Sequence, residues 1–549
     1  MTTRDRPDTG RTTHHPRASG LDSQVGRTGQ HLAAVAVLAA VAITYTWPLL
    51  SRLTVAIPGG PTDLDVATMV WNVGWVSHAL AAGGPLLRTD DVLVPFGADL
   101  RLHTYGLFPG LLVSPLVPLA GVVGAFNLML IGTLVLNGVV CYALLYQETS
   151  SAPASLVAAT CFMLATPLLD QLTVGRPTFA SLWLVAASLL VMRALLRRPH
   201  LWHGVVLAAL LLGAMFTDFQ IALYAALWLA VYAVWRLRWQ HAPSLALGAW
   251  LSAVVFGVVL YPALRSDDVP RPALADMQEY SFRVWDFVDP TVLQHAYGLE
   301  LGVAAVAAII IWRRPSVWLL GALVCEVLAL GPYLQPTEVT LPFAALSLWP
   351  PLGQFRTPYR LAMPAVLGLA VVLGMVLARW RVSNRMWVAL ALVAARMAVA
   401  LLLDPFPTQS YPSYALYQRL AAEPDRFTLL EVPFGVRSGL ERIGNGGEVL
   451  EFYQHVHGKP LLNGMIARLP SSVFTEYRAH PALLLLSGEP IDATAEDLRA
   501  VLAWTDARYI VVHRAMLTAD QRQRIEALVT QIADLEEIES DLAVYRVKV

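Results

Sequence analysis

The polar segments that separate the apolar runs of this chain alternate in charge. Apolar runs recur from His31 to Leu403, and every second break between them carries arginines without a carboxylate. These breaks contain Arg193, Arg197 and Arg198; Arg236 and Arg238; Arg313 and Arg314; and Arg379, Arg381 and Arg385. The intervening breaks contain Asp63, Asp65, Asp90, Asp91 and Asp99; Asp170; Asp218; Asp267, Asp268, Asp276, Glu279, Asp286 and Asp289; and Glu338. Because arginine-rich loops are retained in the cytoplasm during insertion, the carboxylates are predicted to gather on the outer face.

Composition supports a membrane protein and excludes some other classes. Of the 549 residues, 56% are hydrophobic and only 14% are charged, and the mean hydropathy is +0.54. A soluble chain of this length carries far more charge, so a polytopic membrane protein is predicted. The net charge of -1 gives no support for nucleic-acid binding. Cys141, Cys161 and Cys325 lie inside apolar runs, where they are expected to act as small hydrophobic residues.

The apolar runs predict eleven membrane spans, since each is close to the length that crosses a bilayer. The spans are expected near residues 31–50, 124–146, 153–170, 178–194, 201–217, 219–235, 243–264, 298–312, 316–333, 360–379 and 386–403. The apolar stretch 107–122 is interrupted by Pro109, Pro115 and Pro118, each of which removes a helix hydrogen bond. It is interpreted as a re-entrant segment, which leaves every arginine-rich loop inside.

Three regions follow from these patterns. Residues 1–30 are rich in Arg, Thr, Ser and Gly and predict a disordered cytoplasmic tail. Residues 31–403 form the transmembrane domain. Residues 404–549 are charged throughout and predict a small soluble α/β domain outside the membrane. Its strands are expected at 427–432, 508–513 and 542–547, with an amphipathic helix over 518–533.

The first outer loop, 51–106, contains a pair of carboxylates. Asp63 and Asp65 follow a turn that Pro58 and Pro61 restrict, and a helix is expected over 66–80. Trp71, Trp75 and His78 share one face of this helix, which suits a helix lying at the membrane surface; Asp65 and Asn72 share another face. Two carboxylates at this spacing can bind a divalent cation such as Mg or Mn, provide a general base, or cap the helix that follows.

The loop also carries the residues of a family resemblance. An Asp-x-Asp motif near the end of the first span, followed by interfacial helices, resembles the GT-C superfamily of membrane glycosyltransferases. Pro95-Phe-Gly-Ala-Asp-Leu-Arg-Leu-His103, Ala125-Phe-Asn-Leu128 and Phe355-Arg-Thr-Pro-Tyr-Arg360 are similar to features of bacterial members, as is the trailing soluble domain. The resemblance covers the chain through Leu403. It implies transfer of a sugar from a polyprenyl-phosphate-linked donor to a glycan, lipid or protein acceptor at the outer face of the cytoplasmic membrane.

The resemblance also implies roles for single residues. Asp63 or Asp65 would be the catalytic base, with a preference for Asp65 because it borders the helix. Arg356 and Arg360 would contact the donor phosphate, which guanidinium groups match in a bidentate way; the alternative is that both arginines snorkel to the interface. His103, Arg101 and Arg176 are further candidates for that contact. Asp218 is a secondary site candidate, and capping of the next helix is the rival interpretation.

Two other functions fit the sequence. Glu326 lies in the middle of an apolar run, where an ionisable residue suits a lipid or polymer transporter or flippase. A noncatalytic envelope-assembly protein, whose outer domain recruits other enzymes, is the third possibility. His455 and His457 alternate as in a strand and suggest a metal site only weakly, because no further ligand lies nearby.

Overall fold

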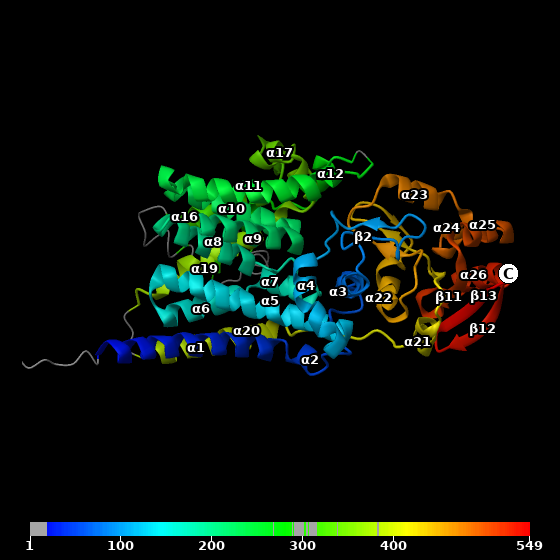
Figure 1. The fold of residues 1–549 in the computed structure, drawn as a ribbon, viewed down its shortest axis with the longest axis horizontal. Coiled ribbons are helices and arrows are strands. Elements are labelled where there is room, and N and C mark those ends of the chain that lie inside the picture. The colour runs from blue at the N-terminus through cyan, green and yellow to red at the C-terminus, as the bar shows by residue number, and fades with distance from the viewer. Residues whose placement is uncertain are drawn as a thin grey trace, which may run out of the picture.

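The chain forms an elongated molecule with a helical bundle at one end and a mixed α/β region at the other (Figure 1). The computed structural model describes residues 19–548 except 267, 288, 290–300, 303–305, 307–315, 338 and 381–383. The helix α3 (Asp65–Ala82) of the first loop lies where the two parts meet, next to α22 (Gly447–His457). The helical part comes first in the chain and the mixed α/β region last.

Eleven helices of the described residues lie largely within the predicted apolar runs. They are α1 (Ser19–Tyr45), α5 (Val117–Thr149), α6 (Ala152–Met163), α7 (Thr166–Thr173), α8 (Trp183–Arg197), α9 (Leu201–Thr217), α10 (Phe219–Arg236), α11 (Ala242–Val259), α16 (Val317–Ala329), α19 (Met363–Leu377) and α20 (Arg385–Leu403). Shorter helical segments connect them: α2 (Trp47–Leu50), α4 (Leu107–Val113), η1 (Ser114–Leu116), η2 (Trp239–His241), α12 (Tyr261–Leu264), α13 (Leu274–Glu279), η3 (Val284–Phe287), α17 (Pro342–Leu346), α18 (Pro350–Gly353) and η4 (Pro358–Ala362). Most of the span expected at 298–312, with Arg313 and Arg314, lies outside the described residues.

Within the described residues, six helices are long and apolar enough to cross a membrane. The number is seven if α6 and α7, which meet at an angle of 47°, form one span. Helices α9 and α16 are apolar but shorter. The protein is therefore a mostly helical, multi-pass membrane protein, while the count of eleven spans stays a prediction.

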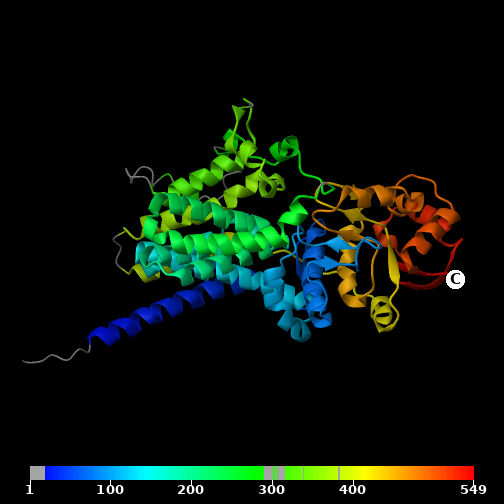
Figure 2. The same ribbon diagram turned by 45° about the horizontal axis from the view of Figure 1, so that its top comes forward.

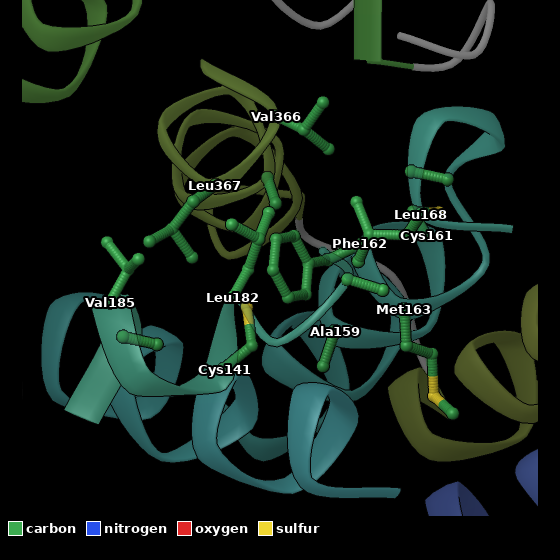
Figure 3. Close-up of a cluster of buried hydrophobic side chains, with 14 of the residues drawn as sticks. Cys141, Ala159, Cys161, Phe162, Met163, Leu168, Leu182, Val185, Val366 and Leu367 are labelled. Carbon is green, nitrogen blue, oxygen red and sulfur yellow. The ribbon is translucent and has the colours of Figure 1, made fainter. Parts of the chain in front are cut away.

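The bundle is closed by small residues and a continuous apolar core. A Cβ atom on Gly204 of α9 would lie 2.1 Å from the carbonyl oxygen of Ser244 on α11, so only glycine permits this close helix contact. Side chains of α5, α6, α8 and α19 meet around the fully buried Phe162 (Figure 3). Cys141, Cys161 and Cys325 are buried and free, as expected.

The start of α1 and the stretch 107–122 differ in detail from the helices expected there. Helix α1 begins at Ser19 and extends beyond the rest of the bundle (Figure 2), so residues 19–30 of the predicted disordered tail are helical. Helix propagation from the packed apolar run adds a hydrogen bond per residue, which explains the extension; residues 1–18 lie outside the described residues. The stretch 107–122 forms α4, η1 and the start of α5, with non-helical geometry at Gly121 (φ 71°, ψ 173°). Helix α4 packs on α3 and α9, and the re-entrant assignment stays a prediction.

The C-terminal part is built on a four-stranded sheet in the order β12-β13-β11-β7. Its strands are β7 (Thr428–Val432), β11 (Ala507–His513), β12 (Ala533–Glu539) and β13 (Leu542–Val547). Strand β7 is parallel to β11, and the other two pairs are antiparallel. The helices are α21 (Ala415–Ala422), α22, α23 (Ser471–Arg478), α24 (Pro481–Leu486), α25 (Ala495–Thr505) and α26 (Ala519–Val529), with η5 (Arg514–Met516). The three predicted strands and the predicted helix after Thr518 are present.

Short strands tie the first loop and the C-terminal region together. Strand β1 (Ile57–Pro58) pairs with β6 (Thr408–Gln409), and β2 (Arg88–Thr89) pairs with β3 (Ala98–Asp99). A second small sheet joins β10 (Gly464–Met465), β8 (Val436–Arg437) and β9 (Arg442–Ile443), and β4 (Tyr333–Leu334) pairs with β5 (Val339–Thr340). Two apolar clusters contain residues of both the first loop and the C-terminal region. The first loop is therefore packed against the C-terminal region.

Two local predictions are wrong, each for its own reason. Trp71 and Trp75 are 1% and 8% exposed; the Trp71 indole donates to Gln454 Oε1 on α22, so this face meets protein instead of lipid headgroups. His455 and His457 lie on the helix α22, not on a strand. The helical repeat of Leu450, Tyr453 and His457, all buried, outweighs the alternation of the two histidines.

Candidate active site

A cavity of about 260 Å³ opens where the bundle, the first loop and the C-terminal region meet. It is lined by residues of all three parts. They are Asp65, Thr68, Met69, Arg101, Leu102, His103, Thr104, Phe179, Met215, Asp218, Phe219, Gln220, Leu260, Leu264, Gln354, Phe355, Arg356, Thr357, Arg360, Arg437, Gly439, Met465, Ala467 and Arg468. Six of the eight site candidates named from the sequence therefore line one space, although they come from four separate segments of the chain; Asp63 and Arg176 do not line it.

Asp65 is the first residue of α3, and its carboxylate is held by two arginines. Arg176 Nη2 lies 2.6 Å from Asp65 Oδ2, and Arg437 Nη1 lies 3.2 Å from Oδ1. The side chain of Asp65 is 22% exposed, so the carboxylate is partly desolvated but still reachable from the cavity. Arg176 follows α7 in the bundle, whereas Arg437 belongs to β8 of the C-terminal region. Because each oxygen of Asp65 contacts a different arginine, the carboxylate is fixed in orientation.

Asp63 has a different environment. Its Oδ2 accepts the backbone N–H of Gly60 at 2.7 Å, which closes the turn before α3. Asp63 is not among the residues that line the cavity. The structure thus separates the two carboxylates: Asp63 stabilises the turn, and Asp65 faces the space where chemistry can occur.

Three arginines bring positive charge to the cavity without a salt bridge to a carboxylate of the described residues, although the charge of Asp218 acts on two of them, Arg360 and Arg468. Within the described residues, no ion pair within 4 Å is formed by Arg356, Arg360 or Arg468. Arg356 stacks over the ring of Tyr280 at 4.7 Å and donates to its hydroxyl oxygen at 3.1 Å. Arg360 lies over the ring of Phe179 at 4.7 Å. The cavity is consequently suited to an anionic group.

The guanidinium of Arg468 is fixed in place by backbone and amide oxygens. It donates to Gln354 Oε1 at 2.8 Å and to the carbonyl oxygen of Gln354 at 2.7 Å. A Cβ atom on Gly439 would lie 2.4 Å from Arg468 Nη1, so a larger residue there would displace the guanidinium, and the Gly439 carbonyl accepts a hydrogen bond from Arg356. Burial, and after it the charge of the nearby Arg356, lower the pKa of Arg468 to about 10, while the charge of Asp218 raises it; the guanidinium stays charged at neutral pH. The guanidinium groups of Arg356 and Arg468 therefore both lie next to Gly439.

Asp218 lies in the single-residue connection between α9 and α10. Its Oδ1 accepts the N–H of Gln220 at 2.8 Å, so the predicted capping role is present. Burial raises the pKa of Asp218 to about 6, although its hydrogen bond to Gln220 and the charges of Arg360 and Arg468 lower it. Asp218 thus caps α10, as the rival interpretation expected, and also lines the cavity.

His103 lines the cavity, but its ring nitrogens are already engaged. Nδ1 accepts the backbone N–H of Ala467 at 3.0 Å, so the proton is on Nε2, which donates to Asn72 Oδ1 at 3.1 Å. Burial lowers the pKa of His103 to about 3, so the ring is neutral. His103 accordingly joins the first loop to the C-terminal region and offers no charge to a phosphate.

Sequence reasoning missed Arg437 and Arg468. Both lie in the C-terminal region, which was expected to be a separate soluble domain, and no local pattern distinguishes them from its other arginines. Arg101 was a weaker candidate; its guanidinium is paired with Asp99, with Nε donating to Oδ2 at 2.9 Å.

Within the part of the chain that the structure describes, no group of three or more His, Cys, Asp or Glu side chains could hold a metal ion.

A second cavity, of about 510 Å³, adjoins the first. Arg101, Leu102 and Arg468 line both cavities and form their common wall. Its other sides come mainly from the β2–β3 hairpin and from the chain around Pro262 and Pro470. The arginine-lined cavity is therefore bordered by room for a further molecule.

This fold is similar, at low sequence identity, to that of GT-C membrane glycosyltransferases. Arabinofuranosyltransferase AftD from Mycobacteria superposes with a TM-score of 0.60 at 16% identity; the match covers 94% of this chain and 40% of AftD, so the chain spans about two fifths of that protein's length. ArnT from Cupriavidus metallidurans, solved bound to undecaprenyl phosphate, superposes with a TM-score of 0.50 at 14% identity over 94% of this chain and 98% of ArnT.

A third solved structure, the Archaeoglobus fulgidus oligosaccharyltransferase, superposes with a TM-score of 0.50 at 12% identity over 88% of this chain and 70% of its own. No protein-family model matches the sequence. No curated protein matches it in sequence. At these identities the likeness concerns the fold alone.

Proposed function

We propose that this protein is a GT-C-type glycosyltransferase that moves a sugar from a polyprenyl-phosphate-linked donor to an acceptor hydroxyl at the outer face of the cytoplasmic membrane. The observation that carries the proposal is the cavity, which brings together an accessible carboxylate, Asp65, and three arginines that form no salt bridge among the described residues. The fold similarity supports the same reaction class. Because one fold can host many functions, the proposed activity is argued from the residues of the cavity.

Asp65 is the proposed general base. The acceptor oxygen forms a bond to the anomeric carbon of the donor sugar, and Asp65 takes the acceptor's hydroxyl proton. The bond between the anomeric carbon and the phosphate oxygen breaks, and its electron pair leaves with the polyprenyl phosphate. Attack opposite to the leaving group inverts the configuration at the anomeric carbon. Asp63 is assigned to the turn, because its carboxylate is bonded to Gly60 and lies outside the lining of the cavity.

The arginines are the proposed phosphate site. Charge grows on the phosphate as the sugar departs, and fixed cations in a desolvated site stabilise such charge strongly. Arg356 and Arg360 take the role expected from the sequence, and Arg468 joins them. The Nε–H of Arg356 is buried and has no hydrogen-bond partner among the described residues, so a donor is free for a phosphate oxygen. The undecaprenyl phosphate bound to ArnT supports a polyprenyl carrier here.

The acceptor is proposed to approach through the second cavity. Arg101, Leu102 and Arg468 line both spaces, so the second cavity lies directly beside the phosphate site. A glycan, lipid or protein hydroxyl is proposed to reach the donor sugar from there. A divalent cation is not needed for this scheme, because two guanidinium groups already engage the oxygens of Asp65. We propose that the carboxylate-bearing loops and the C-terminal region lie outside and the amino terminus inside, because arginine-rich loops stay in the cytoplasm.

The test is transfer in isolated membranes with a series of radiolabelled polyprenyl-phosphate sugars. Wild type should label an acceptor fraction with at least one donor, and Asp65→Asn should lose that labelling. Asp63→Asn is the matched control, because it removes a carboxylate two residues away without touching the cavity. Retained transfer in Asp65→Asn would remove this residue from the mechanism. Addition of EDTA, followed by Mg²⁺ or Mn²⁺, tests the metal and should leave the wild-type rate unchanged.

A further inference from the structure

The carboxylate of Asp65 is shared by cations from two parts of the molecule that are far apart in sequence. Arg176 reaches Oδ2 from the helical bundle, and Arg437 reaches Oδ1 from β8 of the C-terminal region. Each oxygen is thus engaged by a different arginine. Because an aspartate side chain has two rotatable bonds, two such contacts on opposite oxygens fix the plane of the carboxylate.

Arg437 is itself held by a buried acid. Glu448, in the first turn of α22, is 1% exposed, and its Oε1 accepts from both Arg437 and Arg442. Burial lowers the pKa of Arg437, but the hydrogen bonds and charges of Glu448 and Asp65 outweigh it and hold that pKa above its usual value. Arg437 therefore stays charged and cannot swing away from Asp65 without leaving a buried carboxylate with one cation fewer.

We propose that Arg437 is a positioning residue for Asp65, and hence that the C-terminal region completes the active site instead of serving only as an appended domain. This inference rests on the proposed function, since Asp65 needs positioning only if it acts on the acceptor. Arg176 alone would leave Asp65 Oδ1 without a fixed partner. The carboxylate could then rotate away from the acceptor hydroxyl, and a misplacement of about 1 Å can lower a rate on the order of 100-fold.

The chain supplies a matched control for this role. Arg442 lies on β9 and donates to the same oxygen of Glu448, at 3.0 Å, but among the described residues it forms no hydrogen bond or ion pair with Asp65, and it does not line the cavity. Its side chain is 43% exposed and that of Arg437 is 30% exposed, so both substitutions remove a half-exposed cation from Glu448. Only the substitution of Arg437 also removes a contact to Asp65.

The experiment compares steady-state transfer by wild type, Arg437→Gln, Arg437→Lys and Arg442→Gln, with the donor that the wild type uses. We expect Arg437→Gln to lower kcat about 100-fold with little change in the donor KM, because orientation in the transition state is lost while donor binding is kept. Arg437→Lys should recover part of kcat, and Arg442→Gln should stay near wild type.

Two results would overturn the inference. A raised donor KM with kcat unchanged in Arg437→Gln would mean that Arg437 binds the donor phosphate. An equal loss in Arg442→Gln would mean that the effect comes from Glu448 and the local fold. If wild type transfers sugar and Arg437→Gln keeps its kcat, this inference fails alone; if wild type transfers no sugar from any donor, the proposed function fails as well.

A second measurement does not depend on activity. The melting temperatures of Arg437→Lys, Asp65→Asn and the double variant are compared with that of wild type in detergent. Residues in contact show non-additive effects, so the loss in the double variant should be smaller than the sum of the two single losses. Additive losses would show that the two side chains do not interact in the folded protein, and would contradict the positioning role even if Arg437→Gln failed to fold.

Discussion

The substitution Arg360→Gln tests the phosphate site most cleanly, because this arginine has few structural duties. Its guanidinium lies 4.7 Å from the ring centre of Phe179, and its Nε donates to the Tyr359 hydroxyl at 3.4 Å. No carboxylate within 4 Å depends on it among the described residues. Glutamine keeps much of the length and polarity of the side chain, so the cavity should survive while the charge is lost.

The size of the effect follows from the contact that is removed. A hydrogen bond to a charged group contributes about 1.5–3 kcal/mol. Since about 1.4 kcal/mol corresponds to a factor of ten in affinity, the donor KM should rise roughly 10- to 100-fold. Arg101→Gln is the comparison: Arg101 lines the same cavity, but its charge is already taken by Asp99. Its donor KM should therefore rise much less.

The assay is the initial rate of transfer against donor concentration, at saturating acceptor, for wild type and both variants. Thermal stability in detergent, measured in parallel, checks that each variant is folded. A donor KM for Arg360→Gln within about twofold of wild type, a change too small for a lost charged hydrogen bond, would refute the phosphate role. An equal or larger effect of Arg101→Gln would show that unpaired charge is not what selects the donor.

Three further predictions address the cavity, the packing and the orientation. Because Asp218 titrates with a pKa of about 6, its negative charge appears next to the arginines as pH rises from 5 to 7, so the donor KM should increase over that range, and Asp218→Asn should flatten the profile; a profile that is unchanged by the substitution would contradict this. Trp71→Ala should destabilise the protein by about 3–5 kcal/mol, as expected for a fully buried tryptophan, whereas Trp239→Ala, at a residue 93% exposed, should change the stability by less than about 0.5 kcal/mol; thermal or denaturant unfolding in detergent distinguishes them. A cysteine in place of Asp425 should react with a membrane-impermeant maleimide in intact cells, and one in place of Arg198 only after permeabilisation; the reverse pattern would invert the proposed orientation.

Much of the site could be predicted because its signals are local. A helix starting at Asp65 places Thr68, Met69 and Asn72 on the same face by its repeat alone, and the first two line the cavity while Asn72 bonds to His103. The pair Asp63 and Asp65 could not be resolved from sequence, since adjacent carboxylates look alike until the turn at Gly60 is seen to take one of them.

The remainder of the site depends on contacts across the chain. Arg437 is 372 residues from Asp65, and no periodicity relates positions so distant. The tryptophans of α3 show the same limit in another form. Their spacing correctly predicts a common face, but spacing does not tell whether lipid or protein covers that face, and here it is α22 that does.

The proposed mechanism is tested most directly by a structure of the protein with undecaprenyl phosphate bound. The phosphate is predicted to lie in the arginine-lined cavity, with its oxygens within about 3.2 Å, the usual hydrogen-bond distance, of guanidinium nitrogens of Arg356 or Arg360, and with Asp65 lining the same space. A phosphate bound elsewhere, with the cavity occupied only by solvent, would contradict the assignment of this cavity as the site of sugar transfer.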